Sequence, residues 1–374
     1  MRVAIVVTTI FEPRFLDGYV ENLRRFGHDG TTEIIVIIDR KTPPTVAERC
    51  EHHRRAGARV LCPTLEEQES FVARFPSMKG RIPYDTDNRR NIGFLMALER
   101  GAEVLISIDD DNYVLDHVDF VAEHLVTGTT IDDPAAESSD GWLNICTLLH
   151  SSTQDEIFPR GFPYFARRHE RTLRGANEGA ARVAVNAGLW LSDPDVDAMT
   201  RLTQAPRIHA AEDASVRLGR GTWTPINTQN TSIVRDAIAA YYYVRMGFSL
   251  GGLRIDRYGD ILSGYLVAKC VKTRGDAIRI GSPIADHRRT PHNLFKDLYH
   301  ELAGMVLLDD LLPWLTETTI RGSSYAELYA SLADALEAQS ASMKGFVWDD
   351  GGRDFLVETA GHMRAWLEAV AEIG

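Results

Sequence analysis

The sequence predicts an α/β fold in which a mostly parallel sheet is flanked by helices and followed by a helical C-terminal extension. In the N-terminal part of the 374 residues, short apolar runs alternate with segments of helical periodicity, which is the pattern of βαβ units. Beyond residue 293 the periodicity is helical almost throughout, with turns near Gly322 and 349–352. We therefore expect one α/β unit at 1–292 and a helical extension at 293–374.

Three apolar runs near the N-terminus predict strands that are buried on both faces. They cover 3–7, 34–38 and 59–61, and continuous apolar runs of this kind are typical of parallel sheets. Helical spacing lies between them, at 15–26 and 46–56. This β-α-β-α-β order predicts right-handed crossovers between parallel strands.

The rest of the chain continues the alternation. The pattern predicts strands at 104–108, 142–145 and 187–191, helices at 88–100, 236–246 and 261–271, and an exposed loop at 127–141. Neither the dinucleotide fingerprint G-x-G-x-x-G nor a Walker sequence follows the first strand.

The composition argues against several classes of protein. A chain with 44% hydrophobic residues can bury a large core, and its formal net charge of −12 argues against a nucleic-acid binder. No apolar run reaches membrane-spanning length, and the chain begins with a strand, so neither a membrane partner nor a signal peptide is expected. The four cysteines form no C-x-x-C pair, which favours reduced thiols in a cytoplasmic protein.

The strand at 104–108 runs directly into three aspartates. Open α/β sheets bind ligands at the carboxyl ends of their strands, and alternation sends Asp109 and Asp111 to one side and Asp110 to the other. Paired carboxylates suit Mg²⁺ or Mn²⁺ when phosphate oxygens complete the shell. The alternative is an acidic loop that caps a following helix. His287 follows a later strand and would be a third metal ligand, unless it is a surface histidine.

Other polar residues at strand and helix ends are candidates for contacts with a nucleotide. Asp39 ends the second strand, where it would hold a ribose or a base edge, or cap the next turn. Arg90 begins a helix just upstream of the aspartates and would bind a diphosphate through two N–H groups, unless it is solvated. Thr8, at the end of the first strand, is a further candidate for substrate contacts.

A rigid loop carries a single arginine. Arg160 lies among aromatic residues, and Pro159 and Pro163 restrict the backbone on either side of Gly161. A group of basic residues follows, consisting of Arg167, Arg168, His169, Arg171 and Arg174. The group reverses the local charge, which favours an anion site over a solvated helix face.

Acidic residues and one tryptophan complete the candidate set. A predicted strand contains Trp190 and runs into a turn with Asp195 and Asp197. For these two we expect substrate hydroxyl contacts or turn capping rather than a second metal site. Asp256 and Asp260 lie just before an apolar helix, and Asp260 is the candidate general acid and base unless it caps that helix.

Four segments, taken in order, resemble a known family. They are the strand ending in Asp109–Asp111, the loop 160–164, and the segments 188–191 and 195–198. The chain is similar over about residues 1–315 to the reversibly glycosylated polypeptides, which are the plant-type UDP-arabinopyranose mutases. It also resembles bacterial flavin-independent mutases that act on GDP-hexoses such as GDP-L-galactose in nucleoside-antibiotic pathways.

The resemblance implies a GT-A-like fold, Mn²⁺ or Mg²⁺ on the aspartates, and no flavin. Arg160 falls on the arginine that the family can carry as a glycosylated residue, and Arg167 on a second required arginine. Because a guanidinium is a poor nucleophile at its ordinary pKa, Arg160 is open to two interpretations, a covalent carrier of the sugar or a diphosphate clamp.

The resemblance therefore implies a flavin-independent, metal-dependent mutase that interconverts the pyranose and furanose forms of a nucleotide-diphosphate sugar. The expected substrate is a GDP-hexose or UDP-arabinose. The alternatives are a GT-A glycosyltransferase, which requires an acceptor, and a non-catalytic nucleotide-sugar-binding scaffold. A nucleotidyltransferase is disfavoured because its Gly-rich phosphate loop is missing. The base, the sugar and assembly into a homo-oligomer are left open.

Overall fold

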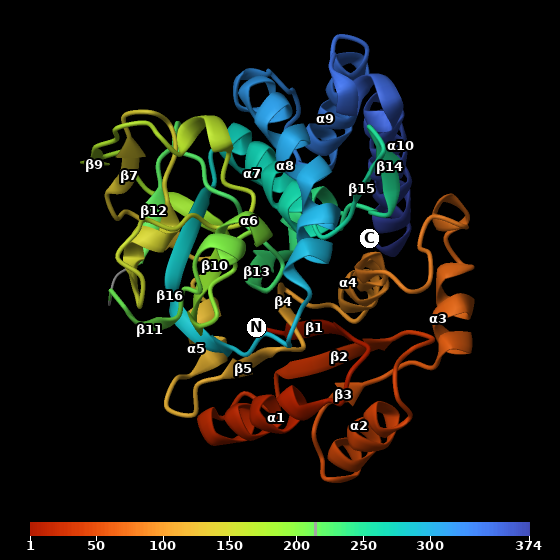
Figure 1. Cartoon of the computed structure of the whole chain (residues 1–374). Helices are drawn as coiled ribbons and strands as arrows, with labels where there is room; N and C mark the ends of the chain where they lie inside the picture. The colour runs from red at the N-terminus through yellow and green to blue at the C-terminus, as the bar shows by residue number, and fades with distance from the viewer. Residues whose placement is uncertain (213–214) are drawn as a thin grey trace.

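The computed structural model describes residues 1–212 and 215–374 around one large mixed sheet (Figure 1). In chain order the sheet contains β1 Val3–Thr9, β2 Thr32–Ile38, β3 Val60–Leu61, β4 Val104–Asp109, β5 Asn112–Val114, β6 Thr130–Ile131, β7 Ala135–Ser138, β8 Leu149–Ser151, β9 Leu173–Ala176, β10 Ala181–Ser192, β11 Ile208–Ala211, β12 Val216–Leu218, β13 Asn230–Val234 and β16 Ala277–His287. Its spatial order is β3-β2-β1-β4-β13-β10-β16-β12-β7-β9, and β3, β2, β1 and β4 are mutually parallel. β13 runs antiparallel to both β4 and β10, and β10 is parallel to β16.

Helices cover both faces of this sheet. They are α1 Arg14–Phe26, α2 Thr45–Arg55, α3 Leu65–Val72, α4 Arg90–Glu99, α5 Phe120–His124, α6 Ala198–Thr203, α7 Gly259–Arg274, α8 Leu294–Glu317, α9 Tyr325–Ser340 and α10 Arg353–Ile373. In Figure 1, α1 and α2 lie below the parallel strands, and α7 to α10 gather at the top of the molecule. A small hairpin of β14 Phe248–Leu250 and β15 Leu253–Ile255 precedes α7. The α/β fold class and its helical C-terminal region are confirmed.

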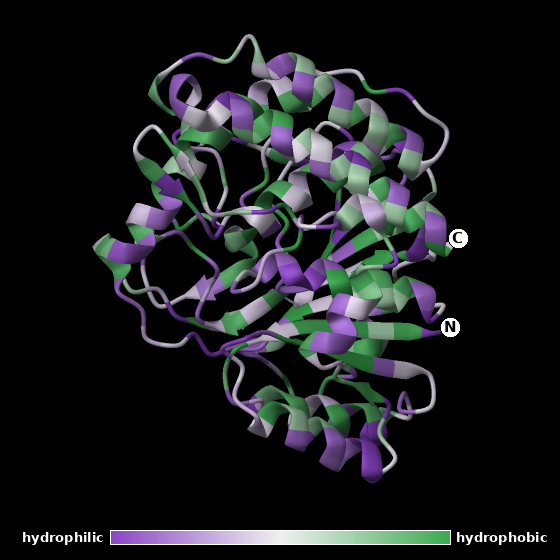
Figure 2. Ribbon diagram, turned by 90° about the vertical axis from the view of Figure 1, so that its right-hand side faces the viewer, coloured by the Kyte–Doolittle hydropathy of each residue, from purple (hydrophilic) through white to green (hydrophobic). Residues whose placement is uncertain are grey.

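The first strand is buried on both faces, as its continuous apolar run predicted. Val3, Ile5 and Val7 pack in one hydrophobic core with α1 and α2. Ala4 and Val6 enter a second core, which also contains side chains of α4 and the C-terminal helices. Alternate side chains of a strand point to opposite faces. Because both faces of β1 are buried, successive residues of this strand are apolar. Figure 2 shows the result as mostly green strands between helices that are partly purple.

The C-terminal helices belong to the same core as the sheet. Leu307 of α8, Leu332 of α9 and Trp366 of α10 are fully buried there, and the Trp366 indole N–H donates to the carbonyl oxygen of Ile238 over 3.2 Å. The domain boundary at residue 292 stays a prediction. In the part of the chain that the structure describes, no helix is both long and apolar enough to cross a membrane.

Two glycines allow the close packing that places site residues. A Cβ on Gly93 would lie 2.4 Å from Val6, so α4 can lie directly on β1, with Arg90 at the edge of the sheet. Gly161 has a φ of +86°, and a Cβ there would lie 2.4 Å from Ile261. The loop with Arg160 therefore packs tightly against the first turn of α7.

Three secondary-structure predictions are wrong. Residues 142–145 form only an isolated bridge from Trp142 to Trp223 before a 3-10 turn at Ile145–Leu148. Residues 236–246 contain a 3-10 helix at Arg235–Ala240 and then irregular chain. The expected loop at 127–141 carries β6 and β7. Short apolar runs fit strands, turns and buried irregular segments equally well, so tertiary pairing decides between them.

We expect His124 to make the protein acid-labile. This imidazole is fully buried among Asn186, Asn230 and Ser232. Burial, assisted by the charge of Arg279, lowers its pKa from 6.5 to about 4. Between pH 6.5 and 4 the His124 imidazole is protonated in the unfolded chain but neutral in the folded one. The free energy of unfolding therefore falls as the pH drops from about 6.5 to 4. The loss from this residue should be roughly 3 kcal/mol.

The measurement is urea unfolding at several pH values for the wild type and His124→Gln. The variant should show a shallower decline of unfolding free energy between pH 6.5 and 4. Equal slopes for the two proteins would show that His124 contributes nothing to the acid sensitivity.

Candidate active site

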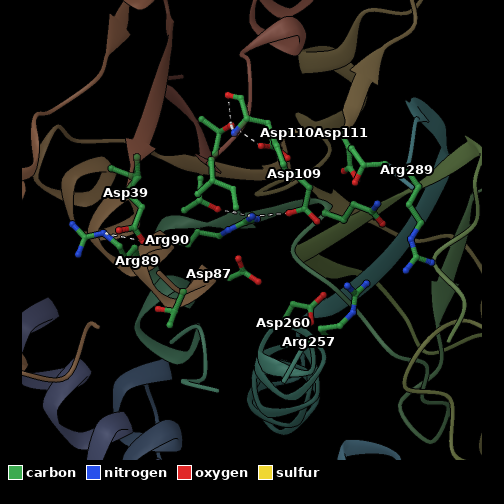
Figure 3. A pocket seen from close by; sticks show the side chains of 18 of the residues that line it. Asp39, Asp87, Arg89, Arg90, Asp109, Asp110, Asp111, Arg257, Asp260 and Arg289 are labelled. Atoms are coloured by element: carbon green, nitrogen blue, oxygen red, sulfur yellow. Dashed lines mark hydrogen bonds and ion pairs between the residues drawn. The ribbon is translucent and has the colours of Figure 1, made fainter. Parts of the chain in front are cut away.

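A cavity of about 390 Å³ lies at the carboxyl ends of β1, β2 and β4 (Figure 3). Its opposite wall is formed by Arg160, the start of α7 and the end of β16. Parallel α/β sheets bind their ligands at this edge, and the volume lies within the range of about 300–1,000 Å³ that is usual for ligand sites.

All three residues of the aspartate cluster, Asp109, Asp110 and Asp111, line this cavity. The expectation that Asp110 points away from the other two is wrong, because the chain leaves β4 at Asp109 and turns at Asp110 and Asp111. The helix-capping alternative is also wrong, since β5 follows rather than a helix. The Asp110 carboxylate accepts a hydrogen bond from the Thr9 hydroxyl over 2.5 Å.

The aspartate cluster concentrates negative charge. Burial, with a contribution from the Asp111 carboxylate, raises the pKa of Asp109 to about 6 against the effect of Arg90. Burial likewise raises the pKa of Asp110 to about 7. For Asp111, burial is outweighed by the hydrogen bond and charge of His287, which lower its pKa.

His287 is buried at the end of β16 with its Nε2 3.3 Å from the Asp111 carboxylate. It is therefore not a surface histidine. Among residues 1–212 and 215–374, however, no three His, Cys, Asp or Glu side chains are arranged as a ready metal site. Asp109 is turned toward Arg90. The three expected metal ligands, Asp109, Asp111 and His287, therefore line one cavity but are not arranged around a common point.

Arg90 is buried behind the aspartate cluster. One terminal nitrogen donates to the Ser107 hydroxyl and the Thr228 carbonyl. The other donates to the Thr8 hydroxyl at 3.2 Å and to Asp109 at 2.6 Å. These contacts occupy both terminal NH₂ groups. The geometry therefore favours a role for Arg90 in orienting Asp109 rather than the expected role in binding a diphosphate.

Asp39 lies at the other end of the cavity, where β2 ends. Its carboxylate accepts from the backbone N–H groups of Arg40 and Asp85, each over 2.7 Å. It therefore caps the turn, as one interpretation predicted, while still facing the cavity. The buried Arg89 guanidinium lies 3.9 Å away.

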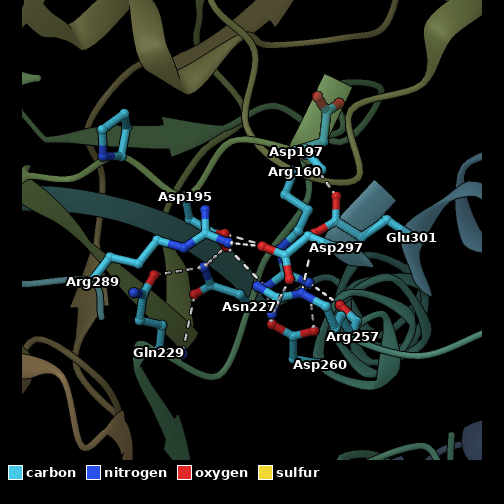
Figure 4. Close-up of polar contacts among 12 residues, drawn as sticks. Arg160, Asp195, Asp197, Asn227, Gln229, Arg257, Asp260, Arg289, Asp297 and Glu301 are labelled. Atoms are coloured by element: carbon cyan, nitrogen blue, oxygen red, sulfur yellow. Dashed lines mark hydrogen bonds and ion pairs between the residues drawn. The ribbon is translucent and has the colours of Figure 1, made fainter. Parts of the chain in front are cut away.

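Arg160 is held by two carboxylates, and we call Arg160, Asp195 and Asp260 the Arg160 cluster (Figure 4). Asp195 accepts from Nε and one terminal nitrogen over 2.9 and 3.1 Å. Asp260 accepts from both terminal nitrogens over 3.1 and 2.6 Å, and the carbonyl oxygen of Arg257 accepts the remaining N–H. All five N–H donors of the guanidinium are thus used.

The electrostatics of the Arg160 cluster follow from this geometry. Burial would lower the pKa of Arg160, but the charges of Asp195 and Asp260 hold it well above its usual value. Burial would likewise raise the pKa of Asp195, but Arg160 lowers it to about 2. In this arrangement Arg160 has no N–H left for a diphosphate and is a poorer nucleophile than a free arginine. Asp260 binds Arg160 and does not cap α7, because the N-cap of that helix makes no side-chain hydrogen bond. The capping interpretation of Asp260 is therefore wrong.

Four predicted site residues lie outside the cavity lining. Asp197 caps α6 and binds Arg167 over 2.5 Å, so the capping interpretation holds for it. Trp190 is a core residue of β10 with 2% exposure. Asp256 lies 3.4 Å from Arg254. The basic group after Arg160 is not a free anion site either, since Arg171 binds Asp140 and Arg174 binds Glu137.

Several cavity residues were not predicted. They are Asp87, Arg201, Gln229, Tyr243, Arg257 and Arg289. Arg257 has a φ of +56°, an uncommon backbone conformation for a residue with a side chain, and this turns its carbonyl toward Arg160. Arg257 and Arg289 stand beside residues that the sequence singles out, Asp260 and His287, but neither was itself predicted to line the site.

The family described as "Reversibly glycosylated polypeptide" matches residues 67–373. The chain belongs to this family. The match includes the aspartate cluster, the Arg160 cluster and His287, and it continues through the C-terminal helices beyond the segment where the resemblance was visible in the sequence.

Curated members of the family are similar to this chain at modest identity. UDP-arabinopyranose mutase 1 of Oryza sativa subsp. japonica is 28% identical over 232 residues, which are 61% of this chain and 57% of that protein. The probable UDP-arabinopyranose mutase 1 of Zea mays is 32% identical over 176 residues, 46% of this chain and 44% of that protein. The chain thus spans about half the length of these relatives.

Solved structures resemble the fold only weakly. Glucosyl-3-phosphoglycerate synthase from Mycobacterium tuberculosis, in complex with Mn²⁺ and UDP-glucose, is 12% identical with a TM-score of 0.40, covering 82% of this chain and 78% of that chain.

Proposed function

We propose that this protein is a nucleotide-sugar mutase that interconverts the pyranose and furanose forms of a nucleotide-diphosphate sugar. The observation that carries the proposal is that the aspartate cluster and the Arg160 cluster face one cavity of about 390 Å³. A single nucleotide sugar would therefore contact the aspartate cluster with its diphosphate and the Arg160 cluster with its sugar hydroxyls. Membership of the family and the names of its curated relatives support this activity.

We assign Asp111 and His287, with Asp109 nearby, to holding Mn²⁺ or Mg²⁺. The donor set fits such a cation, because three carboxylates are neighbours, Arg90 contacts Asp109 among them, and His287 adds a nitrogen donor beside Asp111. When bound, the cation would offset the charge of the diphosphate. We assign Asp39, which lines the far end of the cavity, to accepting an N–H or O–H from the nucleoside.

We assign the proton transfer to Asp260. In the reaction the ring oxygen leaves C1 and gains a proton, while a neighbouring hydroxyl loses its proton and closes on C1. A carboxylate that contacts both oxygens can accept the proton from one and return it to the other. Arg160 would fix the Asp260 carboxylate in place for this transfer, because it binds both of its oxygens.

We assign Arg160 to positioning rather than to covalent catalysis. A covalent carrier needs a neutral guanidine nitrogen, whereas the two carboxylates stabilise the charged form. Arg167 binds the buried Asp197 outside the cavity lining, so we assign it to the stability of that region rather than to the reaction.

The test is incubation of the protein with Mn²⁺ and a panel of UDP- and GDP-sugars without an acceptor, followed by NMR of the sugar nucleotide. A mixture of pyranose and furanose forms is expected, and the sugar that reacts identifies the substrate. UDP-arabinose and GDP-hexoses such as GDP-L-galactose head the panel. Hydrolysis alone, or turnover only after an acceptor is added, would point to a glycosyltransferase. Binding without turnover would point to a scaffold.

A further inference from the structure

One wall of the cavity holds an arginine without a matching carboxylate. Arg201 of α6 lines the cavity, and only 10% of its side chain is exposed. One terminal nitrogen donates to the Pro194 carbonyl oxygen, and the nearest carboxylate, Asp193, lies 3.9 Å away. Among the residues that the structure describes, its buried Nε has no hydrogen-bond partner.

The carboxylates near Arg201 are already engaged by other cations. Asp193 binds the exposed Arg207 over 2.6 Å. Asp195 and Glu301, whose charges also act on Arg201, bind Arg160 and Arg257, respectively, and Figure 4 labels these four residues. Burial, followed by repulsion from Arg289, lowers the pKa of Arg201 to about 10. A buried charge without a counter-ion is costly, and buried polar groups normally have partners. An anionic ligand would supply the partner that is missing.

The position of Arg201 and Arg289 selects the kind of anion. Arg289 lies two residues beyond His287, and the neighbouring N–H of Arg288 donates to the Asp111 carbonyl oxygen over 2.8 Å. Arg289 therefore lies beside the aspartate cluster, and Arg201, on which the charge of Arg289 acts, lines the same cavity. These guanidiniums would bind a phosphoryl group, because one guanidinium can donate two parallel N–H groups to phosphoryl oxygens, and a cation held by the aspartates would offset the remaining charge.

We propose that Arg201 and Arg289 form a phosphoryl subsite that binds the sugar-bearing, distal phosphate of the nucleoside diphosphate. The inference rests on the proposed function for the identity of the ligand. Arg160, whose N–H groups are occupied, would then orient the carboxylates, while Arg201 and Arg289 bind the diphosphate.

The first test measures pyrophosphate binding in EDTA by thermal shift and calorimetry. Arg201→Gln should lose at least about 10-fold in pyrophosphate affinity, as expected for a charge-assisted contact. The matched control is Arg207→Gln, which removes a 61% exposed arginine from the same Asp193 and should bind like the wild type. Without ligand, Arg201→Gln should melt at or above the wild-type temperature, because it removes an unpaired buried charge. Wild-type pyrophosphate affinity in Arg201→Gln, or a large fall in its melting temperature, would overturn the inference.

The second test compares nucleotides in the presence of Mn²⁺. Arg201→Gln and Arg289→Gln should each bind GDP and UDP at least about 10-fold more weakly, while GMP and UMP affinities stay within about 2-fold. If the monophosphates weaken as much as the diphosphates, the distal-phosphate assignment is wrong. If the wild type binds pyrophosphate through Arg201 but isomerises no sugar nucleotide, the proposed function fails and the subsite stands.

Discussion

Replacing Arg160 by lysine is expected to lower kcat for isomerisation by about two to three orders of magnitude, comparable to the loss of a preorganised donor in other enzymes. A lysine keeps the charge, but its single nitrogen cannot bind Asp195 and Asp260 in the paired geometry of the planar guanidinium. Asp260 would then lose the fixed orientation that proton transfer requires. The measurement is kcat and KM by NMR or chromatography, together with the melting temperature.

Two further variants separate positioning from a general effect on the fold. Arg167→Lys alters an arginine that binds Asp197 outside the cavity lining, and it should retain most of kcat. Arg160→Ala leaves two buried carboxylates without their cation, which should also cost about 3–5 kcal/mol of stability. An Arg160→Lys enzyme with wild-type kcat would refute the positioning role. So would a radiolabelled sugar that stays on the denatured wild type and is absent from Arg160→Ala, since that result identifies a covalent carrier.

Replacing Asp111 by alanine is expected to abolish metal-dependent nucleotide binding while leaving the fold intact. Asp111 lies next to His287 and is assigned as a metal ligand, so Mn²⁺ affinity should fall by at least about 100-fold. Stability should fall only modestly, because the variant loses the contact with His287 but also loses one of three neighbouring negative charges. Calorimetry with Mn²⁺ and a nucleoside diphosphate measures the affinity, and thermal unfolding measures the stability.

The matched control for Asp111 is Asp116→Ala, which removes an exposed aspartate just after β5. This variant should bind Mn²⁺ and nucleotide like the wild type. Full activity of the wild-type protein in EDTA would show that the reaction needs no metal. Unchanged Mn²⁺ affinity in Asp111→Ala would show that Asp111 is not a metal ligand.

The parts of the site that could be predicted are those that local pattern determines. A buried strand followed by Asp109, Asp110 and Asp111 is visible because apolar runs and turn residues are neighbours in sequence. His287 could be linked to the aspartates because both end strands, and parallel packing brings such ends to one edge.

The remaining features depend on contacts between distant segments. Nothing in the sequence indicates that Asp195 and Asp260, which are far apart along the chain, bind the same guanidinium. Arg201 could not be recognised because its significance lies in a missing partner. Asp197 was ambiguous for a local reason, since helix capping and substrate binding favour the same residue type.

The most direct measurement is a crystal structure of the protein with Mn²⁺ and a nucleotide-diphosphate sugar. We expect the diphosphate to lie between a cation held by Asp111 and His287 and the guanidiniums of Arg201 and Arg289, with a sugar hydroxyl within hydrogen-bonding distance of Asp260. A nucleotide bound outside this cavity, or a sugar directed away from the Arg160 cluster, would contradict it.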